Sequence, residues 1–270
     1  MTTSWTNADI DFDRIDLAAA RANEPLMSLL ASASLVEAAS DLYTTNLVEY
    51  FKGDAEVAQW LSRHWEPEEL QHGRALREYV ARVWPSFDWE RVFAAFLKEY
   101  GALCQVETLR PTPALEMVAR CVVETGTATL YRAIGTYSPE PVLRDISSRI
   151  RQDEIRHFKH FYRYFRKYQR GERLGRLRVA RALLERVAEV RRDDAGCALR
   201  HVFLGRYPHY AGDAARIDAW TRRIYSMTKR QYPFPMAAKM LLTPLDLHPR
   251  IRPLVGVPIA FAARLVMWGL

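Results

Sequence analysis

Two short segments combine a glutamate with a histidine three residues later, Glu69-x-x-His72 and Glu154-x-x-His157. Residues three apart share one face of a helix, so a carboxylate and an imidazole in this pattern can bind one metal ion together. Counting alone says little, because a chain of 270 residues with 7 histidines produces such pairs by chance. The positions of two further glutamates make the pattern more specific.

The first of these is Glu37, which lies 16 residues before Gly53, while Glu69 lies 16 residues after it. If Gly53 marks a turn between antiparallel helices, equal offsets place the two glutamates at the same height. Glu49 is the rival ligand from the first helix, but it lies roughly 18 Å further along the axis at about 1.5 Å per residue. We therefore predict Glu37 as the ligand.

The second pair follows the same rule, because Glu124 and Glu154 lie 15 residues on either side of Pro139. Two helix pairs would then each present one glutamate opposite one Glu-x-x-His. This is the ligand set with which carboxylate bundles hold two iron ions. The predicted metal ligands are Glu37, Glu69, His72, Glu124, Glu154 and His157.

Charged neighbours of these ligands are candidates for a supporting role. An acid beside a metal ligand can accept the Nδ1–H of a histidine on the facing helix and fix its tautomer. We predict that Asp153 supports His72 in this way, that Glu68 supports His157, and that Arg156 balances their charge. The alternative for Glu68 and Arg156 is a solvated position on the helix surface.

Helices are the only elements that the sequence predicts, since no stretch alternates with period two and no hairpin signal separates apolar runs. Pro67 falls inside the second expected helix, where it either kinks the helix or begins a new one in its first turn. Asp88 is placed as the N-cap of the third. The expected helices are 25–51, 55–83, 88–100, 114–134, 142–169 and 174–192.

Two segments around the predicted ligands resemble a known family. The segment from Trp65 to Gly73 is similar to the W-x-x-E-E-x-x-H-G segment of soluble acyl-carrier-protein desaturases, and the segment from Asp153 to His157 to their D-E-x-R-H segment. Thr127, three residues after Glu124, matches a threonine that lies beside the oxygen site in that family.

This resemblance implies a ferritin-like antiparallel four-helix bundle with additional C-terminal helices. It implies two iron ions as cofactors, dioxygen as co-substrate, and oxidation of an apolar or acyl-carrier-bound substrate by a desaturase, hydroxylase or oxidase. Thr127 would position a proton during oxygen activation, or would instead bond to its own backbone. The chain departs from the family at Gln71, where a basic residue is common, and nothing after Gln169 resembles it.

The sequence predicts three parts of the chain. Residues 1–24 are predicted to be a lead-in, 25–170 the di-iron bundle, and 171–270 a basic helical extension. Residues 1–165 carry 18 Lys and Arg against 24 Asp and Glu, whereas 166–270 carry 21 against 8. A basic surface of this kind suits an acidic protein, nucleic acid or anionic lipid.

The expected partners are an external electron donor such as ferredoxin and an acyl carrier protein, in a monomer or homodimer. Two other functions stay open: a di-iron hydroxylase of a tRNA base, and a ferroxidase or iron-binding protein. The apolar tail from Leu254 is expected to pack on the bundle or to touch a membrane surface. Three cysteines without a C-x-x-C pattern, and no signal peptide, predict a cytoplasmic protein.

Overall fold

The computed structural model of the chain describes residues 4–190, 195–248, 250–251, 254–258 and 260–261. Every regular element in these ranges is helical and none is a strand, so the predicted all-α class is confirmed. None of the described helices is long and apolar enough to cross a lipid bilayer. The chain forms two compact units: residues 1–108, 138–146 and 191–227 make unit 1, and residues 109–137, 147–190 and 228–270 make unit 2.

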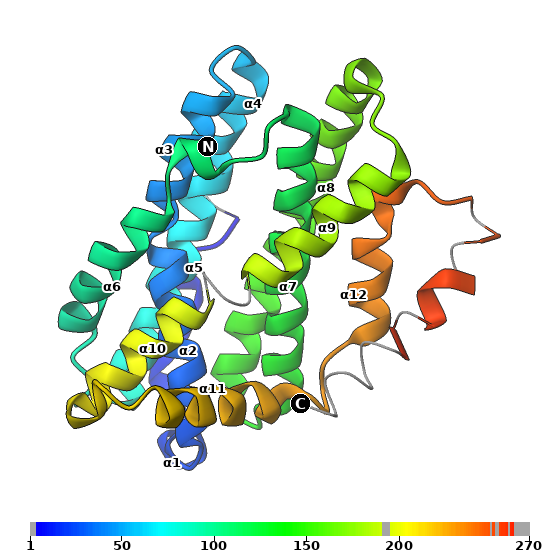
Figure 1. Cartoon of the computed structure of the whole chain (residues 1–270). Coiled ribbons are helices and arrows are strands. Elements are labelled where there is room, and N and C mark those ends of the chain that lie inside the picture. The colour runs from blue at the N-terminus through cyan, green and yellow to red at the C-terminus, as the bar shows by residue number, and fades with distance from the viewer. Residues whose placement is uncertain (1–3, 191–194, 249, 252–253, 259, 262–270) are drawn as a thin grey trace. The chain divides into compact units, whose positions relative to one another are not determined.

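Unit 1 is organised around α2, which packs against α5 and α10, while α10 also packs against α6 (Figure 1). Arg21, just before α2, donates from Nε to the carbonyl of Val83 at the end of α5 at 2.8 Å, so α2 and α5 are antiparallel. The helices of unit 1 are α1 Leu17–Arg21, α2 Glu24–Ala38, α3 Ser40–Tyr50, α4 Ala55–Trp60, α5 Glu66–Val83, α6 Trp89–Leu103, α10 Ala195–Arg206 and α11 Ala214–Thr228.

Helix α2 is buried over most of its circumference, although three of its buried residues are serines. The hydroxyl of Ser32 donates to the carbonyl of Ser28 at 2.8 Å, and that of Ser34 donates to the carbonyl of Ala31 at 2.7 Å. These bonds within the helix reduce the cost of burying the hydroxyl groups of Ser32 and Ser34. Small side chains also let neighbouring helices come close to α2.

The prediction of one uninterrupted helix over 25–51 is wrong, because the helix breaks at Ala39 into α2 and α3. Ala39 has φ −102° and ψ 12°, outside the helical region, and its N–H bonds to Val36 three residues back. No glycine or proline marks the break in the sequence. The break lies two residues after Glu37, one of the predicted ligands.

Pro67 lies in the first turn of α5, the second of the two predicted outcomes. A single π-helical turn, Leu61–Trp65, joins α4 to α5. Proline has no N–H to donate to the preceding turn, which favours a wider turn at this point. Asp88 caps α6 as predicted, since its Oδ1 accepts from the N–H of Arg91 at 3.1 Å.

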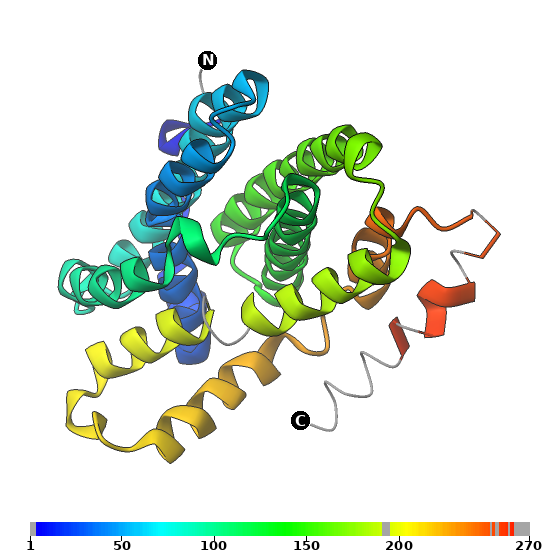
Figure 2. The same ribbon diagram turned by 45° about the horizontal axis from the view of Figure 1, so that its top comes forward.

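Unit 2 is built on α7, against which α9 and α12 pack (Figure 2). Glu172, at the end of α8, accepts from the N–H of Ala114 at 2.8 Å and from the hydroxyl of Thr112, at the start of α7. Helices α7 and α8 are therefore antiparallel. The helices of this unit are α7 Pro113–Tyr137, α8 Pro141–Glu172, which begins in unit 1, α9 Arg176–Glu189 and α12 Phe234–Leu241.

The start of α8 is fixed by Glu140, a buried glutamate in unit 1. Its carboxylate accepts from the N–H groups of Val142 and Leu143 at 3.0 and 2.7 Å, which caps the helix. The hydroxyl of Tyr79 on α5 donates to the same carboxylate at 3.0 Å. One side chain thus ties the first turn of α8 to α5 within unit 1.

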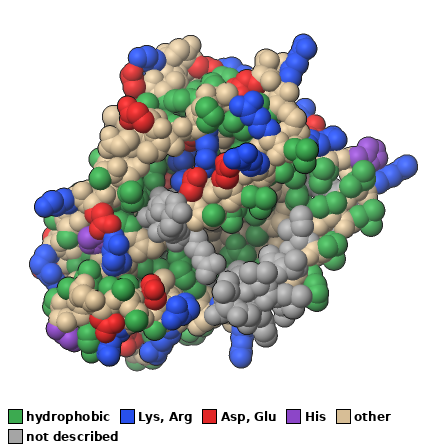
Figure 3. Space-filling model, in the orientation of Figure 1, with side chains coloured by type: hydrophobic (Ala, Val, Ile, Leu, Met, Phe, Trp, Pro, Cys, Tyr) green, Lys and Arg blue, Asp and Glu red, His purple; other side chains and the backbone are tan. Residues whose placement is uncertain are grey.

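The C-terminal tail predicted from Leu254 is described only in part, because residues 259 and 262–270 lie outside the described ranges. Apolar side chains are exposed in the segment drawn red in Figure 1, which forms the right edge of Figure 3. The exposed residues there are Ile251, Leu254, Val257 and Phe261.

Gly73→Ala tests the close approach of α5 to α2. A Cβ at Gly73 would lie 2.7 Å from the backbone nitrogen of Ala38, so the helices would have to separate. We expect a loss of about 1–3 kcal/mol in the free energy of unfolding, measured by denaturant titration. Gly101→Ala in α6 is the control, since nothing lies within 4 Å of its Cβ, and it should be neutral or slightly stabilising. Equal effects at the two positions would contradict this account.

Candidate metal centre

Unit 1 brings three of the predicted ligands together, and we call this cluster half-site 1. Glu37 comes from α2, and Glu69 and His72 come from α5. Their candidate ligand atoms all lie within 4.8 Å of one another. His72 Nδ1 is 3.7 Å from Glu37 Oε2 and 3.9 Å from Glu69 Oε2. All three side chains are buried, and His72 has no exposed surface.

Unit 2 contains an equivalent cluster, half-site 2, on its own antiparallel pair. Glu124 comes from α7, and Glu154 and His157 come from α8. Their ligand atoms also lie within 4.8 Å of one another. His157 Nδ1 is 3.5 Å from Glu124 Oε2 and 4.0 Å from Glu154 Oε2. Each cluster therefore consists of one glutamate opposite one Glu-x-x-His, as the spacing predicted.

The geometry of both clusters fits a metal ion. Histidine-to-carboxylate separations of 3.5–4.0 Å are long for hydrogen bonds. They suit two ligands of one ion, since metal–ligand bonds of about 2.0–2.2 Å put adjacent ligand atoms about 3–4 Å apart. Two buried carboxylates beside one imidazole also favour a cation, because burying negative charge is costly without one. Each half-site could hold a metal ion.

The N-terminal segment, predicted only as a lead-in, covers half-site 1. Trp5 is buried and stacks on the ring of His72, with centroids 6.0 Å apart and planes inclined by 15°. Gln71, the position that departs from the desaturase pattern, donates from Nε2 to Oδ1 of Asn7 at 2.8 Å. The sequence analysis missed Trp5 and Asn7. The only available signal was a tryptophan in an otherwise polar segment.

Thr127 lies against half-site 2. Its hydroxyl can donate to Glu154 Oε2 at 2.7 Å, while the carbonyls of Val123 and Glu124 in its own helix are each 3.3 Å away. A hydroxyl has only one proton to donate. The Glu154 carboxylate is both closer and a stronger acceptor than the two carbonyls. The structure thus places the Thr127 hydroxyl on a predicted ligand.

The predicted supporting residues Glu68 and Asp153 directly precede Glu69 and Glu154 in the chain. Asp153 is buried, and its Oδ1 lies 2.5 Å from Nη1 of Arg156, which is half-exposed. Glu68 is half-buried on α5. The predicted contacts of Asp153 with His72 and of Glu68 with His157 join the two units and stay predictions.

Glu49, the rival ligand, is not part of either cluster. Its side chain is 57% exposed and its Oε1 lies 2.5 Å from Lys52 Nζ. An exposed ion pair of this kind contributes little to stability. Glu49 is therefore a suitable control position for mutations in the half-sites.

Burial raises the pKa of the Glu124 carboxyl to about 8, and the nearby Glu154 carboxylate adds to the shift. Without a metal, the folded protein thus favours the protonated carboxylic acid at this position. A bound cation acts in the opposite direction, because it binds the carboxylate. The stability of the metal-free protein and that of the metal-bound protein should therefore change with pH in opposite directions.

For the metal-free protein, kept in a chelator, we expect stability to fall as pH rises. The folded pKa of Glu124 lies above its unfolded value, so its contribution is complete below about pH 4.5 and is lost as pH approaches 8. Thermal unfolding between pH 5 and 8.5 should show this slope, and Glu124→Gln should flatten it. If the stability of the wild type and of Glu124→Gln changed equally with pH, the raised pKa could not belong to Glu124.

Comparison with known proteins assigns no family to this chain. No protein-family description and no curated protein matches it.

Proposed function

We propose that the protein is an oxygen-dependent di-iron oxidoreductase. The observation that carries this proposal is the repetition of one buried ligand set, a glutamate opposite a Glu-x-x-His, on two antiparallel helix pairs. One such set would give a single ion two carboxylates and one imidazole. Two sets supply the four carboxylates and two histidines of a di-iron carboxylate centre.

The proposal includes an arrangement of the helices. Pairs α2/α5 and α7/α8 would pack as a ferritin-like four-helix bundle, with half-sites 1 and 2 facing each other. Three features support it: each pair is antiparallel, each half-site lies within its helices, and all six ligands are buried. In this arrangement Asp153 could reach His72, and Glu68 could reach His157.

The donor set favours iron over the common alternatives. Carboxylate oxygens with one imidazole per ion suit a metal that changes valence, whereas structural zinc sites are dominated by thiolates. Two iron ions held by these residues would supply the electrons and open positions with which dioxygen reacts. The protein itself contributes Thr127, whose hydroxyl can deliver or hold a proton at Glu154 Oε2.

The substrate class and partners follow from the resemblance to soluble desaturases. We propose an apolar or acyl-carrier-bound substrate and an acidic electron donor such as a ferredoxin. The excess of 21 basic over 8 acidic residues in 166–270 supports acidic partners, because complementary charge speeds docking. No disulfide joins the described cysteines, which supports a reducing, cytoplasmic setting.

Iron loading tests the proposal directly. After anaerobic addition of ferrous iron and removal of excess metal, the wild-type chain should retain two iron ions, and its optical spectrum should change on exposure to oxygen. The double variant Glu69→Ala, Glu154→Ala should retain almost none, since it removes one carboxylate from each half-site. Metal analysis and absorption spectroscopy provide both measurements.

The control for this experiment is Glu49→Ala, which removes an exposed carboxylate on α3 and should load iron like the wild type. Circular dichroism before loading shows whether each variant is folded. If the folded wild type retains no more iron than the double variant, the proposal is wrong.

Thr127→Val tests the role of the hydroxyl. Valine keeps the volume but cannot donate to Glu154, so iron content should stay at the wild-type value. We expect the rate of oxygen consumption with a chemical reductant to fall by about 100-fold, the usual scale of a lost proton donor. Thr125→Val is the control, because that hydroxyl donates to the carbonyl of Cys121 at 2.7 Å. Equal rates in both variants would assign Thr127 a purely structural role.

A further inference from the structure

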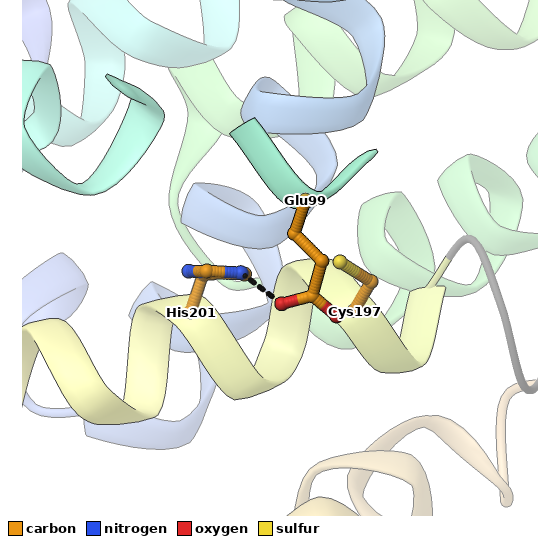
Figure 4. Close-up of side chains that lie close together, drawn as sticks. All are labelled: Glu99, Cys197 and His201. Atoms are coloured by element: carbon orange, nitrogen blue, oxygen red, sulfur yellow. Dashed lines mark hydrogen bonds and ion pairs between the residues drawn. The ribbon is translucent and has the colours of Figure 1, made fainter. Parts of the chain in front are cut away.

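A second cluster of possible metal ligands lies in unit 1, on helices that the half-sites do not use. Glu99 comes from α6, and Cys197 and His201 come from α10 (Figure 4). Residues four apart in a helix share a face, so the thiol and the imidazole project together toward α6. The candidate ligand atoms of all three lie within 4.8 Å of one another.

The same two helices are in close contact about two turns away from the cluster, near Arg91 and Gly205. Arg91 on α6 donates from Nη2 to the carbonyl of Gly205 on α10 at 3.0 Å. A Cβ at Gly205 would lie 2.3 Å from Cγ2 of Val92, so only glycine permits this approach. The position of Glu99 relative to Cys197 and His201 is therefore set by helix packing and not by a loop.

The three side chains converge, and their exposure to solvent increases from Cys197 to His201 to Glu99. Cys197 is 4% exposed, the side chain of His201 is 14% exposed, and that of Glu99 is 46% exposed. His201 Nε2 lies 2.9 Å from Glu99 Oε2, and the edge of the Phe96 ring packs against the imidazole. The thiol lies at the bottom of the cluster and the carboxylate at its outer edge, where a hydrated ion can approach.

A cation already occupies the space between the acid and the thiol. The guanidinium of Arg200 contacts Glu99 Oε1, and its Nη2 lies 3.9 Å from Cys197 Sγ. This side chain is 39% exposed and long enough to swing into solvent. The cluster thus attracts positive charge, and Arg200 would compete with a metal ion for it.

The alternative role for Cys197 is that of a reactive nucleophile. Burial raises the pKa of its thiol to about 11, and the charge of Glu99 adds to the shift. A thiol of this kind carries almost no thiolate at neutral pH and reacts slowly. The raised pKa therefore argues against a nucleophilic role for Cys197.

We propose that Glu99, Cys197 and His201 form a binding site for Zn²⁺ that fastens α10 to α6. One thiolate, one imidazole and one carboxylate are zinc ligands, and a fourth position remains for water. The thiolate excludes Mg²⁺ and Ca²⁺, which prefer oxygen ligands. The same sulfur distinguishes this site from the oxygen-rich half-sites.

Cobalt titration of the full-length chain tests the site, with Co²⁺ as a coloured substitute for Zn²⁺. Wild-type protein should develop one thiolate-to-cobalt charge-transfer band that is removed by Zn²⁺, and in the double variant Glu69→Ala, Glu154→Ala this band should saturate at one ion per chain. Cys197→Ser should abolish the band, while Cys104→Ser, at another buried cysteine, should keep it. The half-sites cannot produce this band from their carboxylates and imidazoles, so the double variant Glu69→Ala, Glu154→Ala should also keep it.

Two further variants separate binding from folding. His201→Gln should weaken Co²⁺ binding by at least about 100-fold, since loss of a direct ligand exceeds the effect of a supporting residue. Arg200→Gln should strengthen it, because the competing guanidinium is gone. In the Glu69→Ala, Glu154→Ala background, Zn²⁺ should raise the Tm, and the addition of His201→Gln should abolish that rise. Absence of the band in folded wild type, or its survival in Cys197→Ser, would overturn the proposal without affecting the iron experiment.

Discussion

Buried negative charge is the constraint on which the rest of this structure depends. The four glutamates of the half-sites, two in each, are 6% exposed or less, and each pair lies beside one histidine. A carboxylate removed from water is costly unless a cation or hydrogen bonds balance it, and the raised pKa of Glu124 expresses that cost in the metal-free chain. Metal binding converts the same cost into a specific affinity, because the ion is attracted most where the negative charge is least hydrated.

The helices around half-site 1 show how the backbone accommodates this constraint. Gly73, directly after His72, lets α5 approach the backbone of α2 at Ala38, one residue from Glu37. Two irregularities accompany this contact. Helix α2 ends at Ala38, just before the break at Ala39, and a π-helical turn precedes α5. The break follows Glu37 and the π-helical turn precedes Glu69. In a regular helix, the helical repeat alone would fix the direction of these side chains. A break or a widened turn can adjust it, which is why such features are frequent at functional sites.

Much of this could be predicted from the sequence, for a physical reason. The ligands recur at helical spacing, and antiparallel pairing converts equal distances from a turn into equal heights, so both half-sites were predicted residue by residue. The break at Ala39 could not be predicted, because no glycine or proline causes it. Trp5 was missed because a polar segment gives no indication of which helix it will cover. Cys197 and Glu99 are 98 positions apart in the chain, and only the packing of α10 on α6 brings them together.

The two kinds of cluster differ in chemistry in a way that would let one chain sort two metals. Half-sites 1 and 2 each offer two carboxylates and one imidazole, a donor set that suits iron in both valence states. The cluster on α6 and α10 offers a thiolate, which binds zinc strongly and would be at risk of oxidation beside a centre that reacts with dioxygen. The cluster of Glu99, Cys197 and His201 has no residue in common with either half-site. If the chain has both proposed activities, oxygen activation and zinc binding, such a separation of donor sets would let each metal be retained by the ligands it prefers.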